Sequence, residues 1–286
     1  MAIALVTDST AVIPQYRIQS TGIEVVPVLI NIDDETYEEG EGIHSQAVIS
    51  AIRAGKSVST SRPTPTTFAQ RYRKLHAAGF NEILSIHLSA DLSGTFEAAV
   101  IGAQQSHLPV QVVDSRTVGL ALGFGVLAAA DAISAGADIA AASGIARRTS
   151  VHSRTWVVVE DLEQLRRGGR VGAAAALVGS ALAVKPVLEV ISGKVVPIEK
   201  VRTTSRAHDR IVELAAKYVH TFGGKFQIGL QHAGAPDKAA GIATKLGKLL
   251  PGVPIITTDL GAVLTSHVGP GAIAITAAPV ENLVHP

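Results

Sequence analysis

Cysteine is absent from the 286 residues, which excludes disulfide bonds, thiolate nucleophiles and cysteine zinc sites together. Aromatic residues make up only 4% of the chain, so the 47% of hydrophobic residues are mainly aliphatic. Charged residues are 17% of the chain, and the formal net charge of +1 comes without a long basic run. That balance argues against a nucleic-acid partner. The composition predicts a large aliphatic core with apolar material left for a ligand.

Long hydrophobic runs are also missing. The two longest apolar stretches, 120–133 and 171–184, are shorter than the ~20 residues that cross a bilayer. The start of the chain, MAIALVTDST, has no basic lead-in and is predicted to be a strand, not a signal peptide. We therefore expect a soluble, cytoplasmic protein with no transmembrane segment, which leaves room for transient contact with a membrane surface.

The first half of the chain alternates short β-branched runs with helical patterns. Such alternation predicts βαβ units and an α/β domain with a largely parallel sheet, over residues 1–152. Asp138 is the expected N-cap of the last helix of this domain. Strands are predicted at 3–7, 25–32, 82–88 and 110–115, and helices at 45–55, 66–79, 95–105, 117–135 and 138–150.

The second half, residues 153–286, is predicted to be an α+β domain, with a lipid site between the two domains. Residues 185–201 are predicted to form two antiparallel strands that turn at Ser192–Gly193, a hairpin. The acidic run 33–42, in the first half, is expected to be a solvated loop. Further strands are predicted at 155–160, 226–232, 254–260 and 271–277, and helices at 205–219 and 236–249.

Three familiar motifs are incomplete. GFGVLA at 123–128 matches a dinucleotide fingerprint but lies inside a helical pattern, which favours helix packing. AGKS at 54–57 ends like a phosphate loop, but Ser50 replaces the required first glycine. Asp91 stands where a hydrolase elbow around Ser93 would need glycine. The ten histidines are scattered without metal-ligand spacing, so neither a metal nor a cofactor is expected.

Hydroxyl and glycine residues gather at 7–10, 59–65 and 92–95, each after a predicted strand or helix. In an open α/β sheet, ligands bind beyond the carboxyl ends of the strands, where helix N-termini point amide donors at them. His267 precedes the rigid Gly269–Pro270–Gly271 turn, which permits close backbone approach. These groups together favour an anionic ligand.

Eight segments follow one another along essentially the whole chain: VTDST, STSRPTP, LSADLSGT, VVDSRTVG, VEDLEQLRRGGRVG, KPVLEV, GKVVPIEKVRT and TSHVGPGAI. In order and spacing they resemble the DegV family, the FakB-type bacterial fatty-acid-binding proteins. The resemblance implies a two-domain α/β protein that buries one long-chain fatty acid. It also implies that the protein presents the carboxylate to a separate ATP-dependent fatty acid kinase, which makes an acyl phosphate for phospholipid synthesis.

The same resemblance implies roles for individual residues. Thr60 and Ser93 would hydrogen-bond the carboxylate, Gly94 would allow its approach, and His267 would lie beside it. Arg170 and Arg202 would lie near the exposed edge, where a kinase or the new phosphate would come. One departure is Arg62, where the family commonly has Gln.

A second class of function stays open, an acyl hydrolase or phosphatase that uses Ser93 and His267. The hydroxyl loops and the aliphatic excess favour the carrier. Because the chain shows neither a phosphate loop nor an evident metal cage, it should not phosphorylate anything by itself, and no catalytic activity is expected of it alone. The small-residue stretches 117–133 and 171–188 are candidates for the wall of a lipid tunnel, and ordinary helix packing explains each of them equally well.

Overall fold

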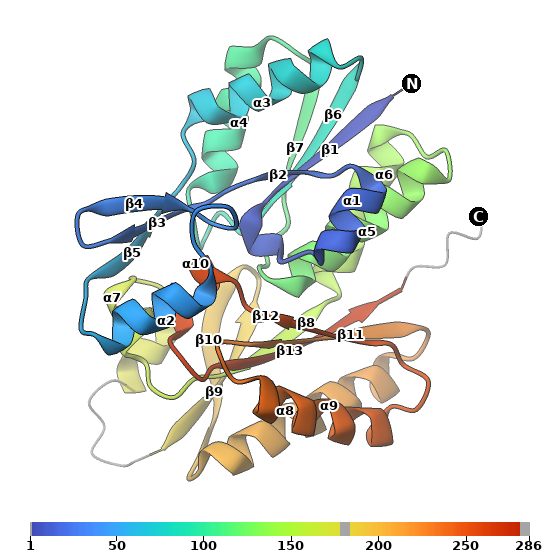
Figure 1. Ribbon diagram of the computed structural model, residues 1–286. Helices are drawn as coiled ribbons and strands as arrows, with labels where there is room; N and C mark the ends of the chain where they lie inside the picture. The colour runs from blue at the N-terminus through green and yellow to red at the C-terminus, as the bar shows by residue number, and fades with distance from the viewer. Residues whose placement is uncertain (1, 178–183, 281–286) are drawn as a thin grey trace.

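The computed structural model describes residues 2–177 and 184–280, whose strands form three sheets (Figure 1). A four-stranded sheet has the order β2-β1-β6-β7, and a three-stranded sheet has the order β4-β3-β5. A six-stranded sheet has the order β10-β9-β8-β13-β11-β12. The first two sheets use strands up to residue 114, and the third uses strands from residue 154 onward. The proposed boundary at residue 152 stays a prediction.

The four-stranded sheet is parallel throughout, as the alternating pattern predicted. Its core strands carry aliphatic residues on both faces. Phe68 and Tyr72 of α3 pack on one face with α4, and Leu122 and Val126 of α5 pack on the other face with α6. The elements are β1 (Ile3–Asp8), η1 (Ser9–Ala11), α1 (Gln15–Thr21), β2 (Glu24–Val26), α3 (Pro65–Ala77), β6 (Glu82–His87), α4 (Thr95–Ser106), β7 (Val110–Asp114), α5 (Leu120–Ser134) and α6 (Ile139–Val151).

The three-stranded sheet differs from expectation. The predicted strand at 25–32 is interrupted at Pro27, which has no N–H for a ladder, so its two halves belong to different sheets. The acidic run 33–42 is not only a solvated loop, because its first part forms a strand that pairs with its predecessor. The elements are β3 (Leu29–Ile32), β4 (Glu35–Glu38), α2 (Ser45–Arg53) and β5 (Val58–Ser61).

The six-stranded sheet is mixed, which confirms the α+β prediction for the second half. Only β11 and β12 pair in parallel, and β9 and β10 form the predicted hairpin. Ser192 and Gly193 have φ values of 49° and 84°, the left-handed conformation that a tight hairpin turn needs. The elements are β8 (Arg154–Val158), β9 (Lys185–Ile191), β10 (Lys194–Val201), α8 (Thr204–Phe222), β11 (Phe226–His232), α9 (Pro236–Leu249), β12 (Ile255–Asp259) and β13 (Ile273–Pro279).

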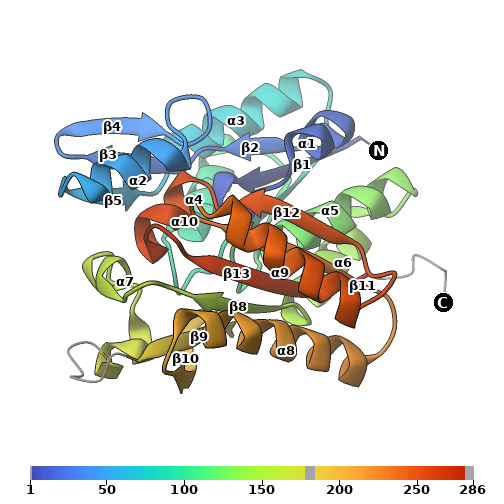
Figure 2. The ribbon, with the colours of Figure 1, turned by 60° about the horizontal axis from the view of Figure 1, so that its bottom comes forward.

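Helix α5 lies between the large sheets, whereas α8 and α9 cover the far face of the six-stranded sheet (Figures 1 and 2). A Cβ on Gly123 would stand 2.4 Å from the Ala11 carbonyl oxygen, and one on Gly125 would stand 2.3 Å from Ser150 Oγ. The glycines of the 123–128 motif therefore serve close helix packing, as predicted. Neighbouring segments approach α5 so closely at these two glycines that no side chain would fit there.

Several short elements were not predicted, among them η1, α1, β4, β5, α7 (Glu163–Arg167) and α10 (Ala262–Val268). A short 3-10 helix, η2 (Gly172–Leu177), lies within the apolar stretch 171–184. In Figure 1, α10 lies between the three-stranded sheet and the six-stranded sheet. It contacts both α2 and β5. Among the described helices, none has the length and apolar character needed to span a bilayer.

Candidate functional site

Strand β5 and helix α10 bring together two predicted site residues that are 207 positions apart. Thr60 Oγ1 lies 2.9 Å from His267 Nε2, a hydrogen-bond distance. Thr60 is held in register by pairing with Ile30 of β3, and α10 packs against the same small sheet. The contact therefore joins the N-terminal part of the chain to the C-terminal part.

The His267 imidazole is neutral in this setting. Burial and, to a smaller extent, the nearby positive charge of Arg170 together lower the pKa of His267 to about 4. Its Nδ1 is shielded from solvent and has no hydrogen-bond partner among the described residues. Gly168 lies against this nitrogen, since a Cβ there would be only 2.4 Å away. The imidazole thus has one nitrogen on Thr60, and its other nitrogen is packed against Gly168 without a hydrogen-bond partner among the described residues.

Arg170 ties two loops together beside this pair. Its Nε donates to the Leu92 carbonyl at 2.9 Å, and its Nη1 donates to the Gly168 carbonyl at 2.5 Å. Arg62, two residues after Thr60, extends over Gly94, and its Nη1 lies 3.4 Å from the Gly94 carbonyl oxygen. Two guanidinium groups therefore flank the loop before α4.

Ser93 lies within this loop, and its side chain hydrogen-bonds to Thr95. Its Oγ lies 2.9 Å from Thr95 Oγ1 and accepts a hydrogen bond from the Thr95 amide at 3.3 Å. Hydrogen bonds, the packing of Gly168 on His267 and the backbone at 60–62 and 92–94 link the residues named above into a ring at the positive end of a 12-residue helix, a setting that favours an anion. We call it the head-group ring: Thr60, Arg62, Leu92, Ser93, Gly94, Gly168, Arg170 and His267.

Arg202 is not brought to this ring. It is exposed, follows β10, and makes no hydrogen bond or ion pair with another described residue. The hairpin turn at the other end of β10 touches the loop before α4, through the bond from Ser89 Oγ to the Gly193 carbonyl at 3.0 Å. A strand of 8 residues spans about 25 Å, which separates Arg202 from that loop.

The geometry does not assemble a serine hydrolase from Ser93 and His267. The Ser93 hydroxyl bonds Thr95, and the imidazole bonds Thr60, with no direct bond between Ser93 and His267 in the described chain. No described carboxylate orients the imidazole through Nδ1. A nucleophile, its base and an orienting acid are therefore not aligned.

A buried polar network explains the hydroxyl loop at 7–10, which was predicted to bind ligand. Asp8 Oδ2 lies 3.0 Å from His87 Nδ1, His87 Nε2 lies 2.7 Å from Ser85 Oγ, and Ser85 Oγ lies 2.9 Å from Tyr72 Oη. All four side chains are fully buried. This series of carboxylate, imidazole and hydroxyl groups resembles a hydrolase triad. The Ser85 hydroxyl, however, is fully buried and lies at hydrogen-bond distance from the Tyr72 hydroxyl. The network joins β1, β6 and α3.

Asp8 also fixes the start of the loop that carries Ser93. Its Oδ2 accepts a hydrogen bond from the Leu88 amide at 3.0 Å, and its Oδ1 accepts one from the Thr10 amide at 3.1 Å. Of the three predicted loops, 59–65 and 92–95 therefore meet in the head-group ring, whereas the hydroxyl and carboxylate of Thr7 and Asp8 are used inside the sheet. Sequence reasoning missed this network because its members come from three elements.

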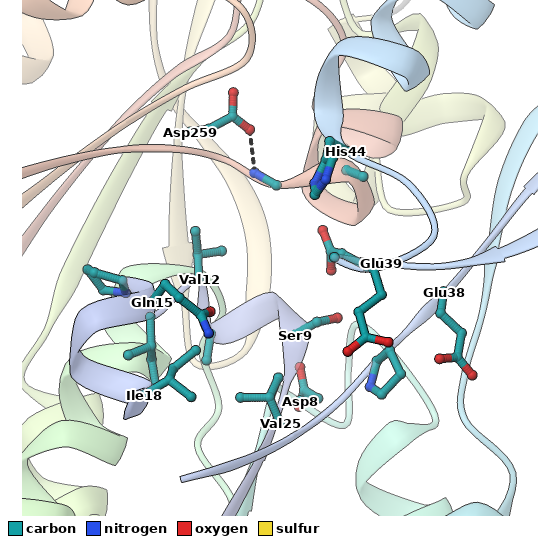
Figure 3. Close-up of a pocket in the computed structure, with 18 of the residues that line it drawn as sticks. Asp8, Ser9, Val12, Gln15, Ile18, Val25, Glu38, Glu39, His44 and Asp259 are labelled. Atoms are coloured by element: carbon teal, nitrogen blue, oxygen red, sulfur yellow. Dashed lines mark hydrogen bonds between the residues drawn. The ribbon is translucent and has the colours of Figure 1, made fainter. Parts of the chain in front are cut away.

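A hollow of about 910 Å³ opens elsewhere, between η1, α1, the 38–45 segment and α10 (Figure 3). Asp8 and Ser9 of the predicted 7–10 loop line it, whereas Thr60, Ser93, Gly94, Arg170, Arg202 and His267 do not. The predicted tunnel wall at 117–133 is mostly the fully packed interior helix α5. The other predicted wall, 171–188, includes 178–183, which lie outside the described residues. Within the described ranges, no three His, Asp or Glu side chains are placed to hold a metal ion.

Fold and site define an α/β protein in which hydroxyl, imidazole and guanidinium groups from separate segments of the chain meet in one ring. The DegV family model matches residues 2–280. The chain belongs to the DegV family, as its ordered motifs predicted.

Relatives cover nearly the whole chain. A DegV domain-containing protein of Streptomyces coelicolor is 41% identical over 274 residues, which are 96% of this chain and 97% of the relative. A solved structure described as fatty acid binding of a DegV family protein from Thermus thermophilus has a TM-score of 0.91 and 31% identity, covering 98% of this chain and 100% of that one. DegV of Bacillus subtilis, described as a fatty acid binding protein, has a TM-score of 0.90 and 32% identity, covering 98% and 100%.

Proposed function

We propose that this protein binds one long-chain fatty acid and presents its carboxylate, at the head-group ring, to a separate ATP-dependent fatty acid kinase. The kinase makes an acyl phosphate for phospholipid synthesis. The observation that supports the proposal most is the pairing of Thr60 with a neutral His267 beside the loop that carries Ser93. Two solved relatives of similar fold are described as fatty-acid-binding proteins.

The acyl tail and the carboxylate contribute differently to the binding free energy of a fatty acid. A chain of about 16 carbons gains ~0.8 kcal/mol for each buried methylene, on the order of 10 kcal/mol before losses. Burial of an unpaired carboxylate costs several kcal/mol, so directional donors are needed at that end. The hydroxyls of Thr60 and Ser93 are such donors, and they orient the head group more than they attract it.

The positive charges of two arginines attract the carboxylate. Arg62 and Arg170 both reach carbonyl oxygens of the loop around Ser93. Arg62 stands where the family commonly has Gln, so it gives this chain an additional cation at the carboxylate. Because the charges flank the ring, they favour a fatty-acid carboxylate and also the acyl phosphate formed from it.

The proposed role of the chain itself is to carry the fatty acid without catalysing a reaction. Phosphoryl transfer to a carboxylate needs a nucleotide and magnesium held in line, and the proposal assigns both to the partner kinase. Because that partner uses ATP, the proposed place of action is the cytoplasm. A hydrolase role is less well supported, since Ser93 and His267 hydrogen-bond different partners.

Native mass spectrometry of the freshly purified protein tests the proposal. We expect one long-chain fatty acid per chain, released on denaturation, and no turnover of acyl esters. Adding the kinase with ATP and magnesium should give an acyl phosphate that hydroxylamine traps as the hydroxamate. Ester turnover that Ser93→Ala abolishes would instead establish the hydrolase, and a chain that neither retains nor binds fatty acid would refute the carrier.

A further inference from the structure

The hollow of about 910 Å³ has a mixed chemistry that the head-group ring does not explain. Six of the chain's 24 acidic residues line it, against a single arginine, although the whole chain has a net charge of +1. That arginine, Arg71, is already paired with Glu24 at 2.8 Å. The cavity therefore has an excess of negative charge. Its acidic lining residues are Asp8, Glu24, Glu38, Glu39, Glu41 and Asp259.

Glu39 has one carboxylate oxygen without a hydrogen-bond partner among the described residues. Its Oε1 accepts a hydrogen bond from the Val263 amide at 2.9 Å, at the start of α10. Its Oε2 is shielded from solvent and has no hydrogen-bond partner among the described residues. Burial raises the pKa of Glu39, and the nearby Asp8 raises it further. A buried oxygen without a donor is costly, so a ligand that brings a donor is stabilised here.

The opposite wall of the cavity is aliphatic. Figure 3 shows Val12 and Ile18 on one side of the hollow and Glu38 and Glu39 on the other. No Phe, Tyr or Trp lines the cavity in the described part of the chain, so the aromatic cage that suits a quaternary ammonium is missing. Apolar lining residues are Ala11, Val12, Ile13, Pro14, Ile18, Ile23, Val25, Pro27, Ile43 and Ala262.

The acidic wall is held in place by its own backbone. The Gly42 and Ile43 amides both donate to the Glu38 carbonyl at 3.1 Å, and the Gly40 amide donates to the Ile43 carbonyl at 3.1 Å. Because this turn is closed by hydrogen bonds, the carboxylates at 38, 39 and 41 are presented from a fixed segment. A preformed cavity of this size is typical of a small-molecule site.

The spacing of the carboxylates distinguishes among cations. Within residues 2–177 and 184–280 no group of three acidic or histidine side chains converges enough to hold a metal ion. Separated carboxylates facing an aliphatic wall match a ligand whose charges are separated by methylene groups. We propose that this cavity binds an aliphatic polyamine, with one ammonium on Glu39, others on the exposed carboxylates, and methylenes against Ile18 and its neighbours.

Calorimetric titration of the full chain with spermidine at low ionic strength tests this proposal. We expect saturable one-to-one binding. Glu39→Gln keeps an oxygen for the Val263 amide but removes the charge, and it should weaken binding at least tenfold. Glu97→Gln removes one exposed charge from α4, outside the cavity, and should leave binding unchanged.

Gln15→Trp gives a second variant that does not alter a carboxylate. Gln15 is an exposed lining residue at the start of α1, so the larger ring fills the hollow without entering the core. This substitution should also weaken spermidine binding at least tenfold. Equal affinity in the Glu39→Gln and Glu97→Gln proteins, no effect of Gln15→Trp, or displacement by an equal concentration of Mg²⁺ would each overturn the proposal. Fatty-acid retention, measured on the same samples, is independent of it.

Discussion

Thr60 Oγ1 lies 2.9 Å from His267 Nε2, and this hydrogen bond ties the edge strand β5 to helix α10. Each of the two residues keeps part of its surface exposed to solvent. The imidazole holds the Thr60 hydroxyl through Nε2, while its Nδ1 is shielded from solvent and has no hydrogen-bond partner among the described residues. The hydroxyl of Thr60 is therefore the side chain whose removal tests the head-group ring most directly.

Thr60→Val removes this hydroxyl and keeps the shape of the side chain. We expect fatty-acid affinity to fall by about 1–3 kcal/mol, roughly 5- to 150-fold, because the carboxylate loses a directional donor. Displacement of a fluorescent fatty acid measures the change. Ser59→Ala is the matched control, since Ser59 is exposed on the opposite face of the same strand. Equal affinities in both variants would place the carboxylate elsewhere.

Arg170→Ala and Arg202→Ala should differ in stability. Arg170 donates to two carbonyl groups that join separate loops, so its loss should lower the free energy of unfolding by about 2 kcal/mol. Arg202 is exposed and unpaired among the described residues, so its loss should change stability by less than about 0.5 kcal/mol. Urea denaturation measures both. Equal stabilities would show that the Arg170 contacts contribute nothing to folding.

His267 should make stability depend on pH. Its folded pKa of about 4 is below the ordinary value of 6.5, so between these pH values the unfolded chain binds a proton that the folded protein refuses. The free energy of unfolding should therefore fall as the pH decreases from about 6.5 to 4, by at most about 3 kcal/mol. Urea midpoints from pH 7.5 to 4 measure this loss. Part of it should vanish in His267→Gln, and superimposable profiles would contradict the buried neutral imidazole.

Gly123→Ala tests the close packing of α5. A Cβ there would meet the Ala11 backbone oxygen at 2.4 Å, so the helix must shift, and we expect a loss of about 1–3 kcal/mol in unfolding free energy. Gly241→Ala in α9 is the control, because nothing lies within 4 Å of its Cβ position. That change should stabilise the protein by about 0.5–1 kcal/mol. A stabilising Gly123→Ala would show that α5 has room.

Local sequence signals determined much of the architecture. Asp138 caps α6 as predicted, with Oδ1 accepting from the Ala141 amide at 2.8 Å. The Ser192–Gly193 turn and the helix at 236–249 lie where the pattern placed them. These elements are encoded by periodicity, caps and turn residues, which act over a few positions and need no partner elsewhere in the chain.

Tertiary structure alone decided which groups meet. Helices α7 and α10 are 5 and 7 residues long, too short to be stable alone, so they form only where other elements pack on them. The sequence supplied Thr60, Ser93 and His267 as candidates, and only folding joined Thr60 to His267, placed Arg202 apart and used Asp8 within the sheet. Chain-distant contacts depend on how whole elements pack, and no local residue pattern carries that information.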